Sequence, residues 1–215
     1  TGKEKKIDPP KTDPNGFPVI RKLVSGKQGQ QSADLFTTNI NSRDMMVRAL
    51  MHFASKGAMN IVGFARKRIE QLMDAGLIES AADIFSLSYD DLVALDGFQQ
   101  KSAQNLLASI ENAKQTTLAR FLFALGIAHV GEETAQRLAN HFATWTAVST
   151  ASKEAYLEVE DVGERVADAL VSYVQDPRHQ QMIERCFRLG LSVAAVKKTT
   201  EHAPLTNKSY VVTGT

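Results

Sequence analysis

Four short turns in this chain have the residue types that could bind an anion through the backbone. Their first residues are Gly63, Gly97, His129 and Asp161, which are separated by 34, 32 and 32 residues. A turn that contains glycine can expose consecutive N–H groups, because no Cβ atom blocks the approach of a ligand. A helical pattern follows each turn, and the first N–H groups of a helix have no partner within it. Turn and helix together predict a site that suits a phosphate group.

The same order of residues occurs in all four units. An apolar residue follows the turn residue, and a third residue then precedes the helix. Four positions further on, a small or aliphatic residue would let the helix approach its neighbour closely. The apolar residues are Phe64, Phe98, Val130 and Val162; the third residues are Ala65, Gln99, Gly131 and Gly163; the residues on the helix are Ile69, Ala103, Ala135 and Ala167. This fixed period indicates a repeated supersecondary unit.

The pattern is typical of helix-hairpin-helix units, whose phosphate contacts carry no sequence information. Two hairpins related by a local twofold axis could hold both strands of a duplex, with basic side chains at the mouth of each site. The apolar residue would hold its hairpin to the body of the domain. The predicted DNA-binding residues are Gly63, Phe64, Ala65, Arg66, Lys67, Gly97, Phe98, Gln99, Lys101, Ser102, Val130, Gly131, Thr134, Val162, Gly163 and Arg165.

The four units are unequal in sequence. Units one and two lack the second glycine of the turn, and units three and four lack the first. Glu132 and Glu133 follow the third hairpin, where they suit a helix N-terminus but would repel phosphate. We therefore expect units one and two to supply more of the direct charge.

Two alternative functions fit parts of the same pattern. Helical arrays that turn on glycine-containing loops can bind proteins, so a helical interaction module of the sterile-alpha-motif kind is one alternative. A nuclease or junction-processing subunit with paired hairpins is the other. Four consecutive units disfavour the second, because such proteins usually carry one or two.

Composition limits the remaining classes of protein. The chain has 215 residues, of which 43% are hydrophobic and 23% charged, as expected of a folded soluble chain. No apolar run approaches the roughly 20 residues that cross a bilayer. The net charge is +1, with +5 in residues 1–60 and −2 in each of residues 61–120 and 121–215. DNA binding by the later part would therefore depend on local geometry.

The single cysteine, Cys186, can form neither an internal disulfide nor a zinc site alone. We interpret it as a packing position on a helix, and a reducing cytoplasm as the compartment. Helical patterns fill the gaps between the units, and no convincing alternating strand pattern occurs between Ser42 and Arg188. The sequence predicts an all-α region there. Ser42 is the expected N-cap of a helix that begins at Arg43.

Two stretches, HFASKGAMNIVGF and KSAQNLLASIENAKQTTLARFLFALGIAHVGEETAQRLANHF, resemble the C-terminal half of bacterial NAD⁺-dependent DNA ligases. That family has a small zinc-finger segment, four helix-hairpin-helix units and a BRCT domain. The resemblance implies a mainly α fold in which residues 1–42 form a linker and irregular zinc-finger-like segment. Residues 43–195 would form the four-unit DNA-binding domain. Residues 196–215, ending in NKSYVVTGT, are similar to a linker and the first strand of a truncated BRCT domain.

The resemblance places Phe17, Ile20, Thr37 and Ser42 where the family has its four zinc-binding cysteines. Phe and Ile cannot ligate a metal, and hydroxyl groups are poor zinc ligands, so we expect the zinc to be lost. An apolar cluster would replace it, made of Phe17, Ile20, Leu23, Leu35 and Phe36. The basic residues of this segment form either a solvated surface or a phosphate-facing patch: Arg21, Lys22, Lys27, Arg43 and Arg48.

The resemblance also implies an enzyme that seals nicks in DNA replication and repair with NAD⁺ and Mg²⁺. In that family a lysine attacks NAD⁺, AMP passes to the 5′-phosphate, and the 3′-hydroxyl displaces it. The lysine lies in a Lys-x-Asp-Gly motif, which this sequence lacks. We therefore expect this fragment to be inactive alone and to bind nicked duplex DNA beside upstream nucleotidyltransferase and OB-fold domains. The expected compartment is the bacterial cytoplasm, at the nucleoid.

Overall fold

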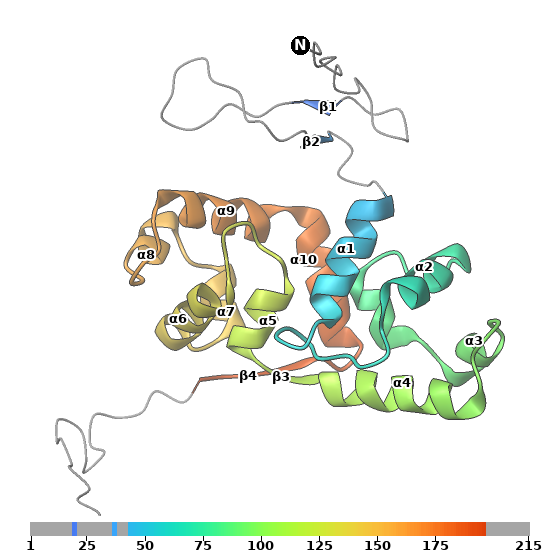
Figure 1. Cartoon of the computed structure of the whole chain (residues 1–215). Coiled ribbons are helices and arrows are strands. Elements are labelled where there is room, and N and C mark those ends of the chain that lie inside the picture. Colours follow the sequence, from blue (N-terminus) through green and yellow to red (C-terminus); the bar gives the residue numbers. More distant parts are fainter. Residues whose placement is uncertain (1–18, 21–35, 38–42, 197–215) are drawn as a thin grey trace, which may run out of the picture. The chain divides into compact units, whose positions relative to one another are not determined.

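The computed structural model describes residues 19–20, 36–37 and 43–196 (Figure 1). The chain divides into two compact parts, an N-terminal part of residues 1–48 and a helical part of residues 49–215. In the N-terminal part, strand β1 (Val19–Ile20) pairs antiparallel with strand β2 (Phe36–Thr37). Val19 lies opposite Thr37, and Ile20 lies opposite Phe36. Helix α1 (Arg43–Ala54) begins in the N-terminal part and ends in the helical part.

The helical part has nine further α-helices, one 3₁₀ helix and two short strands within its described residues 49–196. In chain order they are α2 (Arg66–Asp74), η1 (Ala81–Ser86), α3 (Tyr89–Val93), α4 (Gln100–Ala113), β3 (Gln115–Thr117), α5 (Leu118–Ala124), α6 (Glu132–Phe142), α7 (Trp145–Ser149), α8 (Lys153–Leu157), α9 (Glu164–Gln175), α10 (Pro177–Arg188) and β4 (Ser192–Ala194). The predicted mainly α fold is confirmed. Within the described residues, no helix is long and apolar enough to cross a membrane.

Helices α2, α4, α6 and α9 begin directly after the four predicted turns. Each carries its predicted packing residue with no exposed surface, as the accessible fraction of Ile69, Ala103, Ala135 and Ala167 is 0%. Helix α3 packs against α4, α5 against α6, and α8 against α9. These contacts give each of units two to four a pair of helices joined by its hairpin.

Strand β3 contradicts the expectation that residues between Ser42 and Arg188 are all helical. It pairs in parallel with β4, and Thr116 lies opposite Val193. Three residues are too few to show an alternating pattern, and the partner strand comes from a distant part of the sequence. The pairing, rather than local preference, makes residues 115–117 a strand.

Cys186 lies on α10 and is fully buried, so its interpretation as a packing residue is confirmed. Its thiol donates to the sulfur of Met182 at 3.8 Å. Burial raises the pKa of this thiol to about 12. Since the thiolate is the reactive form, Cys186 is kept unreactive at neutral pH.

Candidate nucleic-acid interface

All four predicted turn residues adopt the left-handed backbone conformation. Their φ angles are 89° at Gly63, 74° at Gly97, 66° at His129 and 61° at Asp161. Glycine adopts this conformation without steric cost. Histidine and aspartate are among the non-glycine residues that adopt it most often. The equal spacing in sequence therefore corresponds to one repeated turn geometry.

The apolar residue of each turn anchors the hairpin. Phe64, Val130 and Val162 are 5%, 6% and 6% exposed. Phe98 is half-buried, and the Arg68 guanidinium carbon lies 3.6 Å from the centroid of its ring. Because these side chains point into the protein or under Arg68, what the hairpins present outward is mostly backbone.

The helices that follow the hairpins begin differently from other helices of the fold. Ala65, Gly131 and Gly163 are N-cap residues with extended backbones, and none has a side chain that could accept a hydrogen bond. By contrast, α3, α7, α8 and α10 start at Ser88, Thr144, Ser152 and Asp176, whose side chains accept from backbone N–H groups. Such caps typically contribute about 1 kcal/mol. Three hairpin helices forgo this stabilisation.

Neither the backbone angles nor the packing at Gly131 and Gly163 requires glycine. Their φ angles of −86° and −93° are available to any residue. A Cβ atom built on either glycine would meet nothing within 4 Å. No described residue of the chain therefore fills the space beside these glycines, and each space adjoins the N-terminus of a helix.

The second hairpin is organised by Ser102. Its hydroxyl oxygen accepts from the Gln99 N–H at 3.0 Å, and its hydroxyl donates to the Gln99 carbonyl at 2.8 Å. The predicted DNA-binding role of Ser102 competes with this local role. Thr134, the other predicted hydroxyl, is half-buried in the first turn of α6.

Basic side chains stand at the first turn of α2 and α4, against the preference of a helix N-terminus for negative charge. Neither helix has an acidic residue in its first turn. Lys67 and Lys101 are exposed, whereas Arg66 forms an ion pair with Glu70 at 2.9 Å. This placement lowers helix stability and raises the affinity of the same position for an anion.

Units three and four have the opposite charge. Helix α6 carries Glu132 and Glu133 in its first turn, and α9 carries Glu164. Lys153 contacts Glu164 at 2.5 Å and Asp168 at 2.6 Å. Hydrogen bonds to Asp168 and Glu164 raise the pKa of Lys153. Arg165 is exposed and is the remaining predicted cation of these two units.

Two contacts that sequence reasoning missed join the units into pairs. In the first pair, units one and two, Arg68 of α2 covers Phe98 and donates to the Gly97 carbonyl at 3.4 Å. In the second pair, units three and four, Arg137 of α6 forms ion pairs with Glu160 and Asp161, both at 2.8 Å. Arg68 and Arg137 lie three and six residues after their N-caps, so no shared position in the repeats marks these contacts in the sequence.

Two of the four predicted zinc positions lie outside the described residues. Ile20 and Thr37 belong to β1 and β2, while Phe17 and Ser42 are not described, nor are Leu23 and Leu35 of the predicted apolar cluster. The predicted cap by Ser42 and the BRCT-like strand also lie outside the described part. Among the described residues, no group of three or more His, Cys, Asp or Glu side chains could hold a metal ion. The types of the four side chains do not fit zinc.

Comparison with known proteins supports the repeat. The family described as "Helix-hairpin-helix motif" matches residues 120–183, and the "SAM-like Helix-hairpin-helix tandem" family matches residues 66–112. A DNA ligase of Shewanella frigidimarina (strain NCIMB 400) is 37% identical over 203 residues, which are 94% of this chain and 30% of that ligase. The chain fits a C-terminal part of a bacterial DNA ligase.

The chain therefore spans about 30% of the length of this ligase relative. The resemblance to bacterial DNA ligases and the tandem helix-hairpin-helix fold are confirmed. The DNA-binding roles of the individual residues, the use of NAD⁺ and the domain boundaries after residues 42 and 195 stay predictions.

Proposed function

We propose that this chain is the part of an NAD⁺-dependent DNA ligase that binds nicked duplex DNA without sequence preference. The observation that carries the proposal is the pair of glycines, Gly131 and Gly163, at uncapped helix N-termini with open space beside them. A DNA phosphate would occupy that space and accept hydrogen bonds from the first N–H groups of α6 and α9.

The four hairpins would contact DNA through different groups. Units one and two would add the charge of Lys67, Lys101 and Arg66 to their backbone N–H groups. Units three and four would bind mainly through backbone groups, since most nearby cations are already neutralised by carboxylates. Backbone and phosphate contacts position a protein on DNA but read no bases, so the binding would be independent of sequence.

The chemistry of sealing would belong to other parts of the parent protein. The sequence has no Lys-x-Asp-Gly motif to carry AMP, and most of the length of the ligase relative lies outside the match. We propose that nucleotidyltransferase and OB-fold domains of the parent use NAD⁺ and Mg²⁺, and that the zinc of the family is lost here. The parent would act in replication and repair in the bacterial cytoplasm.

Fluorescence anisotropy of this chain on nicked, intact and single-stranded DNA, across a salt series, tests the proposal. Log affinity should fall with log salt by about 0.9 per neutralised phosphate, and duplexes of different sequence should bind alike. Gly131→Val and Gly163→Val should each weaken duplex binding, while stability falls by no more than about 1 kcal/mol, because both backbones accept a branched residue and valine is only a poorer N-cap than glycine. Ser172→Val, at an exposed position of α9, is the matched control.

Two results would count against the proposal. If the chain bound none of these DNAs at any salt concentration, a helical protein-interaction module would be favoured instead. Glycine variants that bind duplex as well as the Ser172→Val control does would show that the open space at α6 and α9 is not used by DNA.

A further inference from the structure

Helix α10 and strand β4 belong to none of the four repeated units, yet they contact both hairpin pairs. Helix α10 packs against η1, which lies between the hairpins of units one and two, and against α9 of unit four. Figure 1 shows α10 running between the group α2–α4 and the group α6–α9. A segment with this placement can control how the two pairs sit relative to each other.

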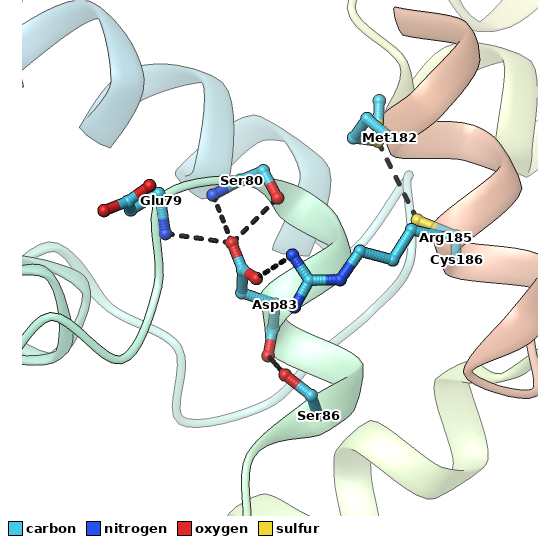
Figure 2. A network of polar contacts seen from close by, with 7 residues as sticks. All are labelled: Glu79, Ser80, Asp83, Ser86, Met182, Arg185 and Cys186. Carbon is cyan, nitrogen blue, oxygen red and sulfur yellow. Dashed lines mark hydrogen bonds and ion pairs between the residues drawn. The ribbon is translucent and has the colours of Figure 1, made fainter. Parts of the chain in front are cut away.

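The first anchor of this segment is an ion pair between Arg185 of α10 and Asp83 of η1 (Figure 2). One carboxylate oxygen of Asp83 contacts the Arg185 guanidinium at 2.5 Å. The other oxygen accepts from the Glu79 N–H at 3.0 Å, the Ser80 N–H at 2.7 Å and the Ser80 hydroxyl at 2.8 Å. The Asp83 side chain is only 11% exposed, so η1 holds it firmly for Arg185.

The second anchor is the backbone of β4 and of Val196, two residues after it, and residues 177–196 are called the α10–β4 segment below. The Ser192 N–H donates to the carbonyl of Lys114, the C-cap residue of α4, at 2.7 Å. The Val196 N–H donates to the carbonyl of Ala143, the C-cap residue of α6, at 2.9 Å. Between these bonds, β4 pairs with β3, which lies in the connection from unit two to unit three. One short segment thus binds the ends of helices from both pairs.

Core packing fixes α10 between its anchors. Phe187 of α10 lies with its ring centroid 5.8 Å from that of Phe121, a fully buried residue of α5. The pairs also meet elsewhere, because Arg120 of α5 donates to the Lys56 carbonyl at 2.8 Å. Of these connections, the α10–β4 segment is the one with anchors at η1, α4 and α6.

We propose that the α10–β4 segment is a brace that sets the spacing and orientation of the two hairpin pairs, so that both can bind one duplex together. This inference rests on the proposed function. Two binding modules that are held in the right geometry bind far more tightly than either alone, and the gain disappears when the geometry is wrong. In this view Arg185 is a positioning residue that acts on DNA affinity without touching DNA.

The test compares Arg185→Gln with Arg188→Gln, which removes the same charge from an exposed residue of the same helix. Affinity would be measured for a duplex of about 24 base pairs, which can reach both pairs, and for one of about 8 base pairs, which can reach one. Arg185→Gln should lower affinity for the long duplex about tenfold and leave the short duplex unchanged. Arg188→Gln should affect both duplexes equally.

A second measurement follows the brace without DNA. Spin labels at Gln104→Cys of α4 and Ser172→Cys of α9 report the distance between the pairs, since both positions are exposed and Cys186 is buried. Arg185→Gln should broaden the distance distribution, and so should Ser192→Pro, which deletes the hydrogen bond to Lys114. Arg185→Lys, which keeps the charge, should restore much of the parent distribution.

The outcomes separate the two proposals. An unchanged distance distribution in both variants, or equal losses of affinity on the long and short duplexes, would overturn the brace. A chain that binds no DNA would overturn the proposed function, and the label distances alone would then decide whether the segment fixes the two pairs.

Discussion

Gln71 and Arg137 occupy the same position in their helices, six residues after the N-cap, and each binds the hairpin of the next unit. The Gln71 amide donates to the Asp96 carbonyl at 2.8 Å. The Arg137 guanidinium contacts the carboxylates of Glu160 and Asp161, both at 2.8 Å. The pairing of units one with two and three with four is therefore built from equivalent residues. The chemistry differs, because the second pair uses a cation to neutralise an acidic hairpin.

Arg137→Gln should weaken duplex binding by the second pair. The variant places glutamine at this position, as Gln71 does in unit one. It leaves Glu160 and Asp161 without their counter-ion beside a phosphate site. Stability should fall by only about 0.2–1 kcal/mol, because these carboxylates are exposed. Anisotropy at low and moderate salt, with urea unfolding of the same samples, measures both effects. Arg188→Gln provides the control for loss of one charge, and equal affinities in the two variants would contradict this role of Arg137.

Lys101→Glu should have opposite effects on folding and on DNA binding. Glutamate in the first turn of α4 suits the helix N-terminus, so stability should rise by about 0.3–1 kcal/mol. Affinity for duplex should fall, and the slope of log affinity against log salt should decrease by about 0.9 if one phosphate contact is lost.

Arg66→Glu is the informative companion variant. It should also weaken DNA binding, but its stability should change little, because the like-charge pair that replaces the i,i+4 ion pair with Glu70 offsets the gain from an acidic residue at the start of α2. Unchanged DNA affinity in both variants would mean that the basic first turns of α2 and α4 do not face phosphate.

The turn geometry could be predicted from sequence because it is local. Gly63 and His129 differ in type, yet each is followed by an apolar residue and an amphipathic helix, and both have positive φ. The contacts between units could not be predicted. Asp83 and Arg185 are 102 positions apart, and nothing near either residue marks its partner. Strand β3 was missed for the same reason.

Gly131 is not the residue that strains its turn. A glycine in a hairpin suggests that substitution would strain the backbone as well as obstruct DNA. Its φ of −86° and the open space around it remove the first effect. The residue that bears the unusual conformation of this hairpin is His129, two positions earlier, and a single sequence gives no means to distinguish these roles.

His129→Gly should stabilise the helical part, whereas His129→Val should destabilise it. A non-glycine residue in the left-handed conformation costs roughly 1–2 kcal/mol, and the β-branched valine fits least well. Glycine removes that strain, but it lowers stability by about 0.4–1 kcal/mol because it increases the conformational entropy of the unfolded chain. A net gain of up to about 1.6 kcal/mol should appear in urea unfolding. Equal stability of the glycine and valine variants would contradict a strained turn at His129.

Asp83→Asn should cost stability in a manner that depends on pH. Burial raises the pKa of Asp83, but hydrogen bonds from Glu79 and Ser80 and the charge of Arg185 outweigh it and hold the pKa below its usual value. A carboxyl whose pKa is lower in the folded state stabilises the fold above its unfolded pKa, and this stabilisation is lost as the pH falls through the folded pKa.

The Asp83→Asn variant should therefore lose about 1–3 kcal/mol of unfolding free energy at pH 7. Below about pH 4 the difference should begin to shrink, because the carboxyl of the unfolded parent chain binds a proton there before that of the folded chain does. Urea unfolding of parent and variant between pH 7 and pH 3 measures this, with Asp90→Asn, at an exposed position of α3, as the control. A difference between parent and Asp83→Asn that stays constant over this range would show that the carboxylate charge is not what joins η1 to α10.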